Sequence, residues 1–477
     1  MTKRLVVVCA VLGLLCAAGG IAVAGLDFGT YRDKTLAGMS KDQFGFGTPI
    51  SQSSSQQVTK KEARANPLSL FTLAKGLHAR VVSTDVARVA DQSAFYPSPQ
   101  NPQYLITCNE QSTPQAGVQR VSLATGAAET IVTGTRFCDP VRETPWGTYI
   151  FGEENGRGPD GGHMYELIDP LGTTGVTLDR TTGVFSGGTG AQNLRTLTSF
   201  GSASFEGIAI LPTGVTYVDP DDSGLGPKKG RPGDSYFKFI PDHPWTPGDP
   251  PITDLSQSPY TSGSWYGLRV GGGSPFSGYG QGREFGLATW IALPGGTNPD
   301  LENQGAAAGL TGYYRPEDAD LDLGALKQGL VRFCGSDTGD ETHHLYGQVV
   351  CITDGTLSQA TGNTATPEIQ PFEIGGTSEG INMPDNVAYQ PGRGNWIIHE
   401  DAETTFEFPH NNDLWDCLPD GKDQDLLSDG CVRVATLNDL TAEWTGGIFD
   451  ASGTRFFVSI QHNISGKGTI IEIDGWR

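Results

Sequence analysis

The sequence predicts an all-β protein, a six-bladed β-propeller with long loop insertions, and two observations predict it. Sixty-six glycines and 30 prolines are spread through the 477 residues, which favours many short strands over long helices. Short β-prone runs bounded by turn residues recur at roughly ten-residue spacing, as in the four-stranded blades of a propeller. The chain exceeds the usual size of a single core, and a large closed β architecture accommodates that length.

Residues 1–24 have the pattern of a secretory signal peptide. Lys3 and Arg4 precede an apolar run over residues 5–15, and Ala22-Val23-Ala24 forms a small-x-small cleavage site. We therefore expect a secreted or periplasmic protein without a membrane anchor. Cleavage leaves 30 basic residues against 54 acidic ones, a net charge of −24 that disfavours nucleic acid as a partner.

The rest of the chain divides into an irregular N-terminal segment, residues 25–70, and a propeller domain, residues 71–477. Within the first segment, residues 60–65 could form a short helix, and no chemistry is apparent there. Strands are expected at residues 79–82, 103–108, 117–121, 129–132, 146–151, 164–168, 205–211, 215–218, 236–240, 268–270, 287–293, 330–334, 347–353, 395–399, 432–436 and 456–460.

Two insertions interrupt this series, at residues 242–282 and 295–312. Long loops usually cover one face of a propeller, so they could form a lid over the channel or simply decorate the surface. At the other end of the chain, residues 467–476 have strand-like composition and could close the ring with N-terminal sequence.

Six cysteines remain after cleavage of the signal peptide, and an even number in an exported chain indicates disulfides. Proximity in the sequence favours Cys108 with Cys138, Cys334 with Cys351 and Cys417 with Cys431, although six cysteines permit 15 pairings. None of them has the spacing of zinc ligands.

Acidic residues at strand ends are the candidate metal ligands. The aromatic run of residues 146–151 ends at Glu153 and Glu154, whose mutual repulsion a hard cation would offset, although a solvated strand end is the alternative. In a propeller, carboxylates far apart in sequence converge on one channel. The full candidate set is Glu153, Glu154, Glu206, Glu317, Asp385 and either Glu400 or Asp401, with Asp401 preferred.

Five segments in order resemble motifs of the PhoX-type alkaline phosphatase family, and the resemblance runs from about Gly76 to the C-terminus. They are residues 146–155 (W-G-T-Y-I-F-G-E-E-N), 205–209 (F-E-G-I-A), 315–318 (R-P-E-D), 384–388 (P-D-N-V-A) and 449–462 (F-D-A-S-G-T-R-F-F-V-S-I-Q-H). The resemblance implies a channel holding an iron and calcium cluster that acts on phosphate esters. It also implies that Arg315 grips the substrate phosphate, for which a forked guanidinium is suited.

The sequence departs from this family at Gly152, which occupies the place of a cysteine that binds iron. Without that thiolate, iron binding is doubtful and calcium is the expected cofactor, since calcium takes oxygen ligands. The leading hypothesis is a secreted metal-dependent hydrolase acting on small phosphomonoesters. The alternatives are a non-catalytic, calcium-stabilised propeller that binds a partner, and a propeller lactonase or esterase.

Overall fold

The computed structural model describes residues 30–156, 158, 160–221, 234–271, 285–339, 345–376, 380–402, 411–421 and 427–477. The expected signal peptide lies outside these ranges, as does part of the first expected insertion. Among the described residues, no helix has the length and apolar composition needed to cross a membrane.

Nearly all strands pair antiparallel with their neighbours in sequence, as short runs separated by Gly-rich turns should. One six-stranded sheet contains β3 (Ala90–Tyr96), β4 (Tyr104–Asn109), β5 (Ala116–Ser122), β6 (Ala128–Thr133), β10 (Val176–Asp179) and β11 (Val184–Ser186). A four-stranded sheet contains β7 (Cys138–Glu143), β8 (Tyr149–Glu153), β9 (Met164–Leu167) and β12 (Leu194–Thr196).

The remaining strands form three further sheets. The largest has nine strands: β13 (Phe205–Ile210), β14 (Thr216–Pro220), β15 (Phe237–Pro241), β16 (Gly263–Val270), β17 (Gly286–Ala292), β21 (Glu368–Ile374), β20 (Gln348–Thr353), β19 (Arg332–Asp337) and β18 (Pro316–Leu321). The next contains β22 (Pro384–Tyr389), β23 (Trp396–Glu400), β24 (Asp413–Leu418), β25 (Gly430–Leu437) and β1 (Phe71–Leu73). The last contains β26 (Glu443–Phe449), β27 (Arg455–Gln461), β28 (Ile470–Asp474) and β2 (His78–Ser83).

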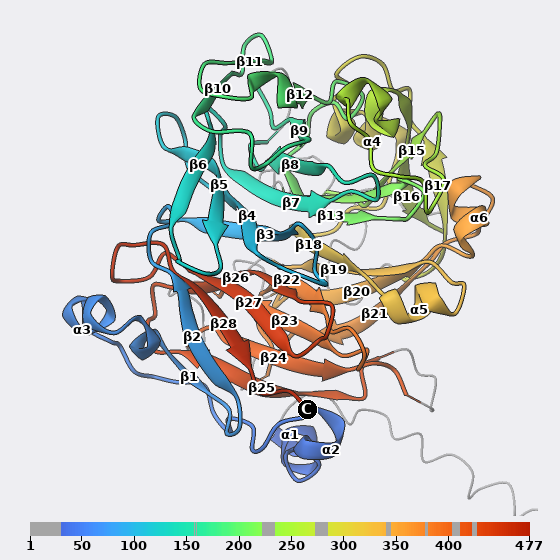
Figure 1. Ribbon diagram of the computed structural model, residues 1–477. Helices are drawn as coiled ribbons and strands as arrows, with labels where there is room; N and C mark the ends of the chain where they lie inside the picture. Colours follow the sequence, from blue (N-terminus) through green and yellow to red (C-terminus); the bar gives the residue numbers. More distant parts are fainter. Residues whose placement is uncertain are drawn as a thin grey trace, which may run out of the picture.

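The sheets are arranged around a common centre, which confirms the predicted propeller (Figure 1). Strands β3, β7, β13, β18, β22 and β26 each contact the next one, and β26 contacts β3, so these first strands line the centre in a closed ring. Hydrogen bonds group the described strands into five sheets, because β17 pairs with β21 and joins two meanders. Six blades therefore stay a prediction that the ring of first strands favours.

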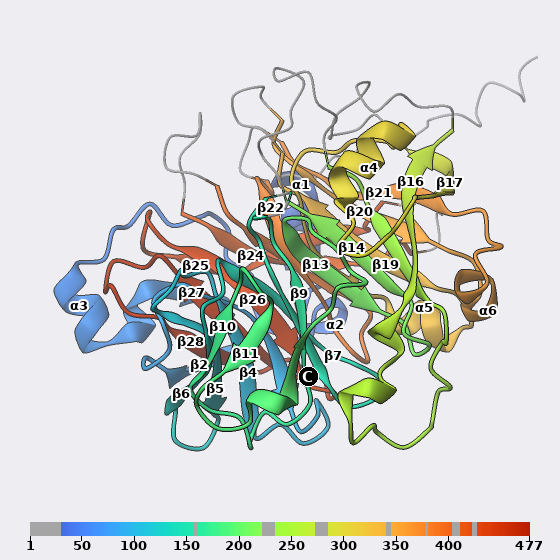
Figure 2. The ribbon, with the colours of Figure 1, turned by 90° about the horizontal axis from the view of Figure 1, so that it is seen from above.

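The two ends of the domain meet in one sheet, as expected from the strand-like C-terminus. β2 pairs antiparallel with β28, from His78 opposite Asp474 to Ser83 opposite Ile470. Apolar side chains such as Val118 and Phe151 are fully buried between neighbouring sheets. Figure 2 shows the sheets side by side, with β2 and β28 in the same layer.

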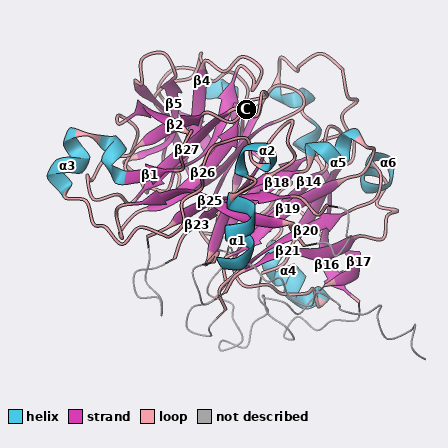
Figure 3. Ribbon diagram, turned by 90° about the horizontal axis from the view of Figure 1, so that it is seen from below, coloured by secondary structure: helices cyan, strands magenta, loops and turns pink. Residues whose placement is uncertain are grey.

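Helices lie at the margins of the propeller in the view of Figure 1, and seen from below α1 and α2 lie in front of the sheets (Figure 3). They are α1 (Thr30–Ala37), α2 (Ser40–Gln43), α3 (Lys60–Ala65), α4 (Leu301–Ala308), α5 (Leu323–Lys327) and α6 (Leu357–Thr361). The expected insertion at 242–282 contains a regular strand, β16, and the one at 295–312 contains α4, whose N-cap is Asp300. Their proposed role as a lid remains a prediction.

The N-terminal segment packs against the sheet that contains β25. Ile50 N donates to Arg433 O at 3.0 Å, and Val58 N donates to Asn438 O at 2.7 Å. Helix α3 begins at a capping box in which Thr59 and Glu62 exchange hydrogen bonds between side chain and backbone. This segment is therefore docked onto the propeller along most of its described length.

Three disulfides are present, with the pairing expected from sequence proximity. Cys108–Cys138 crosslinks the first two sheets, whereas Cys334–Cys351 and Cys417–Cys431 join adjacent strands within a sheet. Cys138 immediately precedes Asp139, so the first disulfide anchors the start of β7.

Candidate metal centre

Each first strand contains a β-bulge, which lies at the start of the strand in all but β26. The register shifts between Ala90 and Ser93 in β3, and the same irregularity recurs in the other five first strands. A bulged residue leaves the ladder and is re-aimed. In five of these strands it is an acid, namely Asp91, Asp139, Glu206, Glu317 and Asp385, all buried. In β26 the corresponding residue is Gly446.

A second set of acids follows directly after the second strand of several blades. Glu110 follows β4, Asp221 follows β14 and Asp401 follows β23, while Glu154 follows β8. Because first and second strands are antiparallel, the end of one lies beside the start of the other. The two sets of carboxylates therefore meet at one end of the channel.

Three groups of these carboxylates are close enough to share a cation. Asp91, Glu110 and Asp139 form one group, Asp139, Glu154 and Glu206 the next, and Glu206, Glu317 and Asp385 the third, each with ligand oxygens within 4.8 Å of one another. Asp139 and Glu206 each belong to two groups, so the three groups are contiguous. Such a set of oxygen donors suits calcium or another hard cation.

The electrostatics of the site favour a cation. Burial raises the pKa of Glu206 well above its usual range, and the carboxylates of Asp139 and Glu317 raise it further. Burial likewise raises the pKa of Asp385, with an added contribution from Asp401. Like charges in a low dielectric disfavour joint ionisation unless a positive charge offsets them.

Arg315 supplies one positive charge at this cluster. Its Nη2 lies 2.7 Å from Glu317 Oε1 and its Nε lies 3.4 Å from Asp221 Oδ2. Its backbone has a φ of 50°, a left-handed value that is uncommon for a residue other than glycine. The predicted phosphate-binding residue therefore lies beside the predicted ligands Glu317 and Asp385, with 27% of its side chain exposed.

Glu153 does not join the cluster, although the sequence had made it a candidate ligand. Arg180 Nε donates to Glu153 Oε1 at 2.8 Å, and Arg180 Nη2 donates to Oε2 at 3.1 Å. The backbone nitrogens of Arg136 and His163 also donate to this carboxylate. Consecutive residues of a strand point to opposite faces, so when Glu154 faces the channel Glu153 faces away.

The neighbouring pair Glu400 and Asp401 divides in the same way. Glu400 is fully buried and accepts hydrogen bonds from Trp415 Nε1 at 2.9 Å and from the backbone of Asn382 and Asp413. Asp401 instead interacts electrostatically with Asp385, Arg315 and Glu443. Of the two alternatives, Asp401 is the residue close to the cluster.

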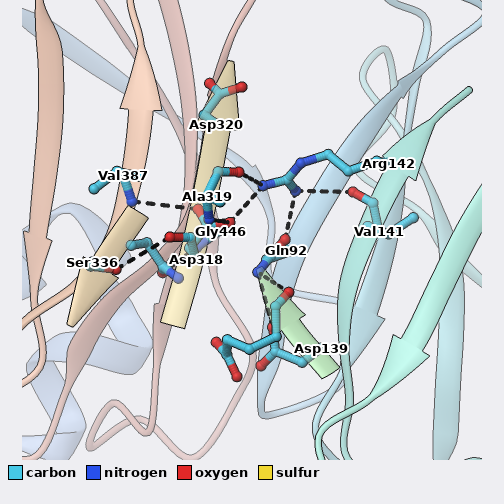
Figure 4. Close-up of polar contacts among 12 residues, drawn as sticks. Gln92, Asp139, Val141, Arg142, Asp318, Ala319, Asp320, Ser336, Val387 and Gly446 are labelled. Atoms are coloured by element: carbon cyan, nitrogen blue, oxygen red, sulfur yellow. Dashed lines mark hydrogen bonds and ion pairs between the residues drawn. The ribbon is translucent and has the colours of Figure 1, made fainter. Parts of the chain in front are cut away.

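Arg142 of β7 is linked to the cluster through a chain of polar contacts (Figure 4). Its Nη2 donates to Asp318 Oδ1 at 2.6 Å, and its Nη1 donates to Gln92 Oε1 at 2.5 Å. Gln92 Nε2 in turn donates to Asp139 Oδ1 at 3.1 Å. Burial raises the pKa of Asp318 to about 6, and the guanidinium of Arg142 opposes that rise. A second, partly buried cation therefore fixes, through Gln92, the orientation of Asp139 in the cluster.

The structure does not provide the thiolate that an iron site of the resembling family would use. All six cysteines in the described part of the chain are in disulfides. A Cβ at Gly152 would lie 2.5 Å from Met164 Sδ and 3.0 Å from Phe205 Cβ, so a cysteine there would have to displace Met164. The residues present therefore fit hard, oxygen-ligated cations and do not fit a thiolate-bound iron.

Several residues at the site could not be found from the sequence motifs. Asp91, Glu110, Asp139 and Glu443 lie outside the five motif segments, and Gln92 and Arg142 are second neighbours of the ligands. The sequence does contain a signal for the missed acids. In five of the first strands, the second residue of the strand is an acid. That signal requires the strand boundaries and bulges, which single-sequence patterns do not define.

The fold and the site together define a β-propeller whose channel gathers carboxylates from several blades around an arginine. Residues 84–463 match the family model described as alkaline phosphatase PhoX. The chain belongs to the PhoX alkaline phosphatase family.

One solved structure supports this fold, and two others show weaker similarity. The structure of Pseudomonas fluorescens PhoX in complex with vanadate, a transition state analogue, superposes with a TM-score of 0.59 at 14% identity, covering 89% of this chain and 98% of that chain. A protein of unknown function from Dyadobacter fermentans gives a TM-score of 0.43 at 8% identity, covering 84% of this chain and 100% of that one. The Escherichia coli aldose sugar dehydrogenase gives 0.42 at 9% identity, with coverages of 84% and 99%. A search of the curated proteins found no match.

Proposed function

We propose that this protein is a calcium-dependent phosphomonoesterase whose active site is the carboxylate cluster of the channel. The observation that carries the proposal is the convergence of Asp139, Glu154, Glu206, Glu317 and Asp385 beside Arg315, in a chain of the PhoX family. An anionic phosphate ester is repelled by carboxylates, so its binding beside them needs a cationic side chain. The guanidinium of Arg315 is such a group and can donate hydrogen bonds to phosphate oxygens.

In this proposal the carboxylates hold the cations and Arg315 orients the ester. The two outer nitrogens of its guanidinium would donate to two phosphate oxygens and so fix the phosphorus relative to the acids. Bound calcium would act as a Lewis acid that offsets the charge developing on the phosphoryl oxygens. Arg142 and Gln92 keep Asp139 oriented, as partners of metal ligands usually do.

We further propose that the protein is secreted or periplasmic. Three disulfides support this location, since such bonds persist in oxidising compartments. The signal-peptide pattern of residues 1–24 supports it as well. Calcium would then be acquired outside the cytosol.

Metal analysis combined with an activity assay tests the proposal. The purified protein should contain calcium and hydrolyse 4-nitrophenyl phosphate at alkaline pH. Chelation should abolish hydrolysis, and added calcium should restore it. Calcium without hydrolysis of this or any other phosphomonoester would favour a non-catalytic propeller, and hydrolysis of lactones or carboxylic esters instead would favour the lactonase alternative.

A further inference from the structure

A basic recess opens beside the carboxylate cluster. It is lined by Lys60 and Arg64 of α3, by Arg88 and by His462, and its volume is about 620 Å³, within the roughly 300–1,000 Å³ of small-molecule sites. No carboxylate lines it among the described residues. In a chain of formal net charge −22, this local reversal of charge attracts anions that the rest of the surface repels.

Three consecutive residues at the end of β27 connect the recess to the metal centre. Gln461 Nε2 donates to Asp91 Oδ2 and to Glu110 Oε1, both at 2.7 Å. His462 Nε2 lies 3.2 Å from Glu443 Oε1, and its φ of 55° takes it out of the strand's alternation. His462 and Asn463 both line the recess. The recess is therefore one residue away from side chains that contact the cluster acids.

Two cations of the recess, Lys60 and Arg64, are directed at one place. A Cβ at Gly466 would lie 3.7 Å from Lys60 Nζ and 3.8 Å from Arg64 Nη2, so both groups converge over this glycine. Arg64 Nε donates to Ser465 O at 2.8 Å, which holds α3 against the loop after β27. Within the described part of the chain, Lys60, Arg64 and Arg88 form no ion pair with a carboxylate.

We propose that this recess is a second anion subsite, and that the preferred substrates are phosphomonoesters carrying a second anionic group. The inference rests on the proposed function, because it places the ester phosphate at Arg315 and the second anion at Lys60, Arg64 and Arg88. It assigns a function to the N-terminal segment, whose helix α3 supplies Lys60 and Arg64 to the recess and is held to the loop after β27 by Arg64.

A matched pair of substrates and a matched pair of variants test it. Hydrolysis of glucose 1,6-bisphosphate and glucose 6-phosphate is compared in the wild type, in Lys60→Gln/Arg88→Gln and in Lys61→Gln/Lys75→Gln. The second variant loses the same charge from residues that do not line the recess. Arg64 is left unchanged because it also holds the loop at Ser465.

We expect the ratio of kcat/KM for the bisphosphate to that for the monophosphate to fall about five-fold in the recess variant, because two exposed charge contacts are lost. In the control variant the ratio should not change, and turnover of glucose 6-phosphate should stay the same in all three proteins. Equal ratios in the two variants would overturn the inference while leaving the phosphatase activity established.

Titration calorimetry with glucose 1,6-bisphosphate examines the recess independently of turnover. If the wild type hydrolyses neither ester, the proposed function fails and this binding measurement still decides about the recess. Binding about five-fold weaker to the recess variant than to the control variant supports the anion subsite. Equal affinities contradict it.

Discussion

Arg315 and Glu317 form an ion pair across Pro316, with Arg315 Nη2 at 2.7 Å from Glu317 Oε1. Proline fixes its own φ and so limits the freedom of the link between the two side chains. Burial would lower the pKa of Arg315, but Glu317 and Asp221 raise it, so the guanidinium stays charged at alkaline pH. The proposed phosphate ligand and a proposed metal ligand are therefore held together by both backbone and charge.

Replacing Arg315 by lysine should lower kcat/KM for phosphomonoesters about ten-fold or more, equivalent to roughly 1.4 kcal/mol, because the forked contact with two phosphate oxygens is lost. Lysine keeps the charge, so folding and calcium content should be preserved. Steady-state kinetics with elemental analysis of the same sample measure both. An unchanged kcat/KM would show that Arg315 only neutralises its acidic neighbours.

The neighbours Glu153 and Glu154 should respond differently to the same substitution. Glu154→Gln, like Glu206→Gln, should reduce the calcium-dependent rise in Tm, because each removes a charge from the cluster. Glu153→Gln should lower stability by about 2 kcal/mol or more by weakening the buried pair with Arg180. Its calcium-dependent rise in Tm should match the wild type.

Thermal unfolding at several calcium concentrations distinguishes these variants. If Glu154→Gln and Glu206→Gln keep the full calcium effect, the shared cluster is not the calcium site. If Glu153→Gln loses it, the division of the pair between structural and metal-binding roles is wrong.

Gly152→Cys should not create an iron site in this chain. The new Cβ would overlap Met164 Sδ, and overpacking of this kind costs about 1–3 kcal/mol. Gly152→Ala should cost about as much, and a Met164→Ala background should relieve both losses. Urea unfolding and iron analysis are the measurements. Stoichiometric iron in the wild type or in the single cysteine variant would contradict the expected preference for calcium.

The free energy of unfolding should decrease as the pH rises, and part of this decrease should come from Glu143. Burial raises the pKa of Glu143 to about 7, whereas in the unfolded chain it ionises near 4.5. As the pH rises, the unfolded state therefore loses this proton before the folded state does. The folded state is thereby destabilised relative to the unfolded state between about pH 4.5 and 7. Between pH 5 and pH 8 the loss should be about 2 kcal/mol.

Glu143→Gln removes that titration. Urea unfolding at pH 5 and pH 8 should show a smaller decrease for this variant than for the wild type, with Asp249→Asn, an exposed substitution, behaving as the wild type does. Parallel pH dependences in Glu143→Gln and the wild type would rule out the buried, protonated state of Glu143.

The sequence allowed the fold to be predicted because the propeller is encoded locally. Glycine turns and alternating short runs define each meander, and the strand-like composition of residues 467–476 indicated the closure that β28 makes with β2. The pairing of β17 with β21 could not be predicted, because it joins strands separated by about eighty residues and has no local signal.

Membership of the acidic cluster was predictable where an acid stands inside a family motif. Glu154, Glu206, Glu317 and Asp385 were found in this way, and they lie in or beside the same cluster. Glu153 was included for the same reason, and it lies elsewhere because strand alternation sends it to the opposite face. Asp91 and Asp139 were missed because their role depends on a bulge, a property of the paired strands and not of either segment alone.

The pairing of β2 with β28 also determines which contacts can form late in folding. Loop closure over almost the whole domain must precede this pairing, and such non-local contacts make folding slow. Gln461 near the C-terminus reaches Asp91 near the N-terminus only when the ring is closed. During synthesis the hydrogen bonds from Gln461 to Asp91 and Glu110 therefore form only after β27 has emerged, long after the three acids of the group to which Asp91 and Glu110 belong.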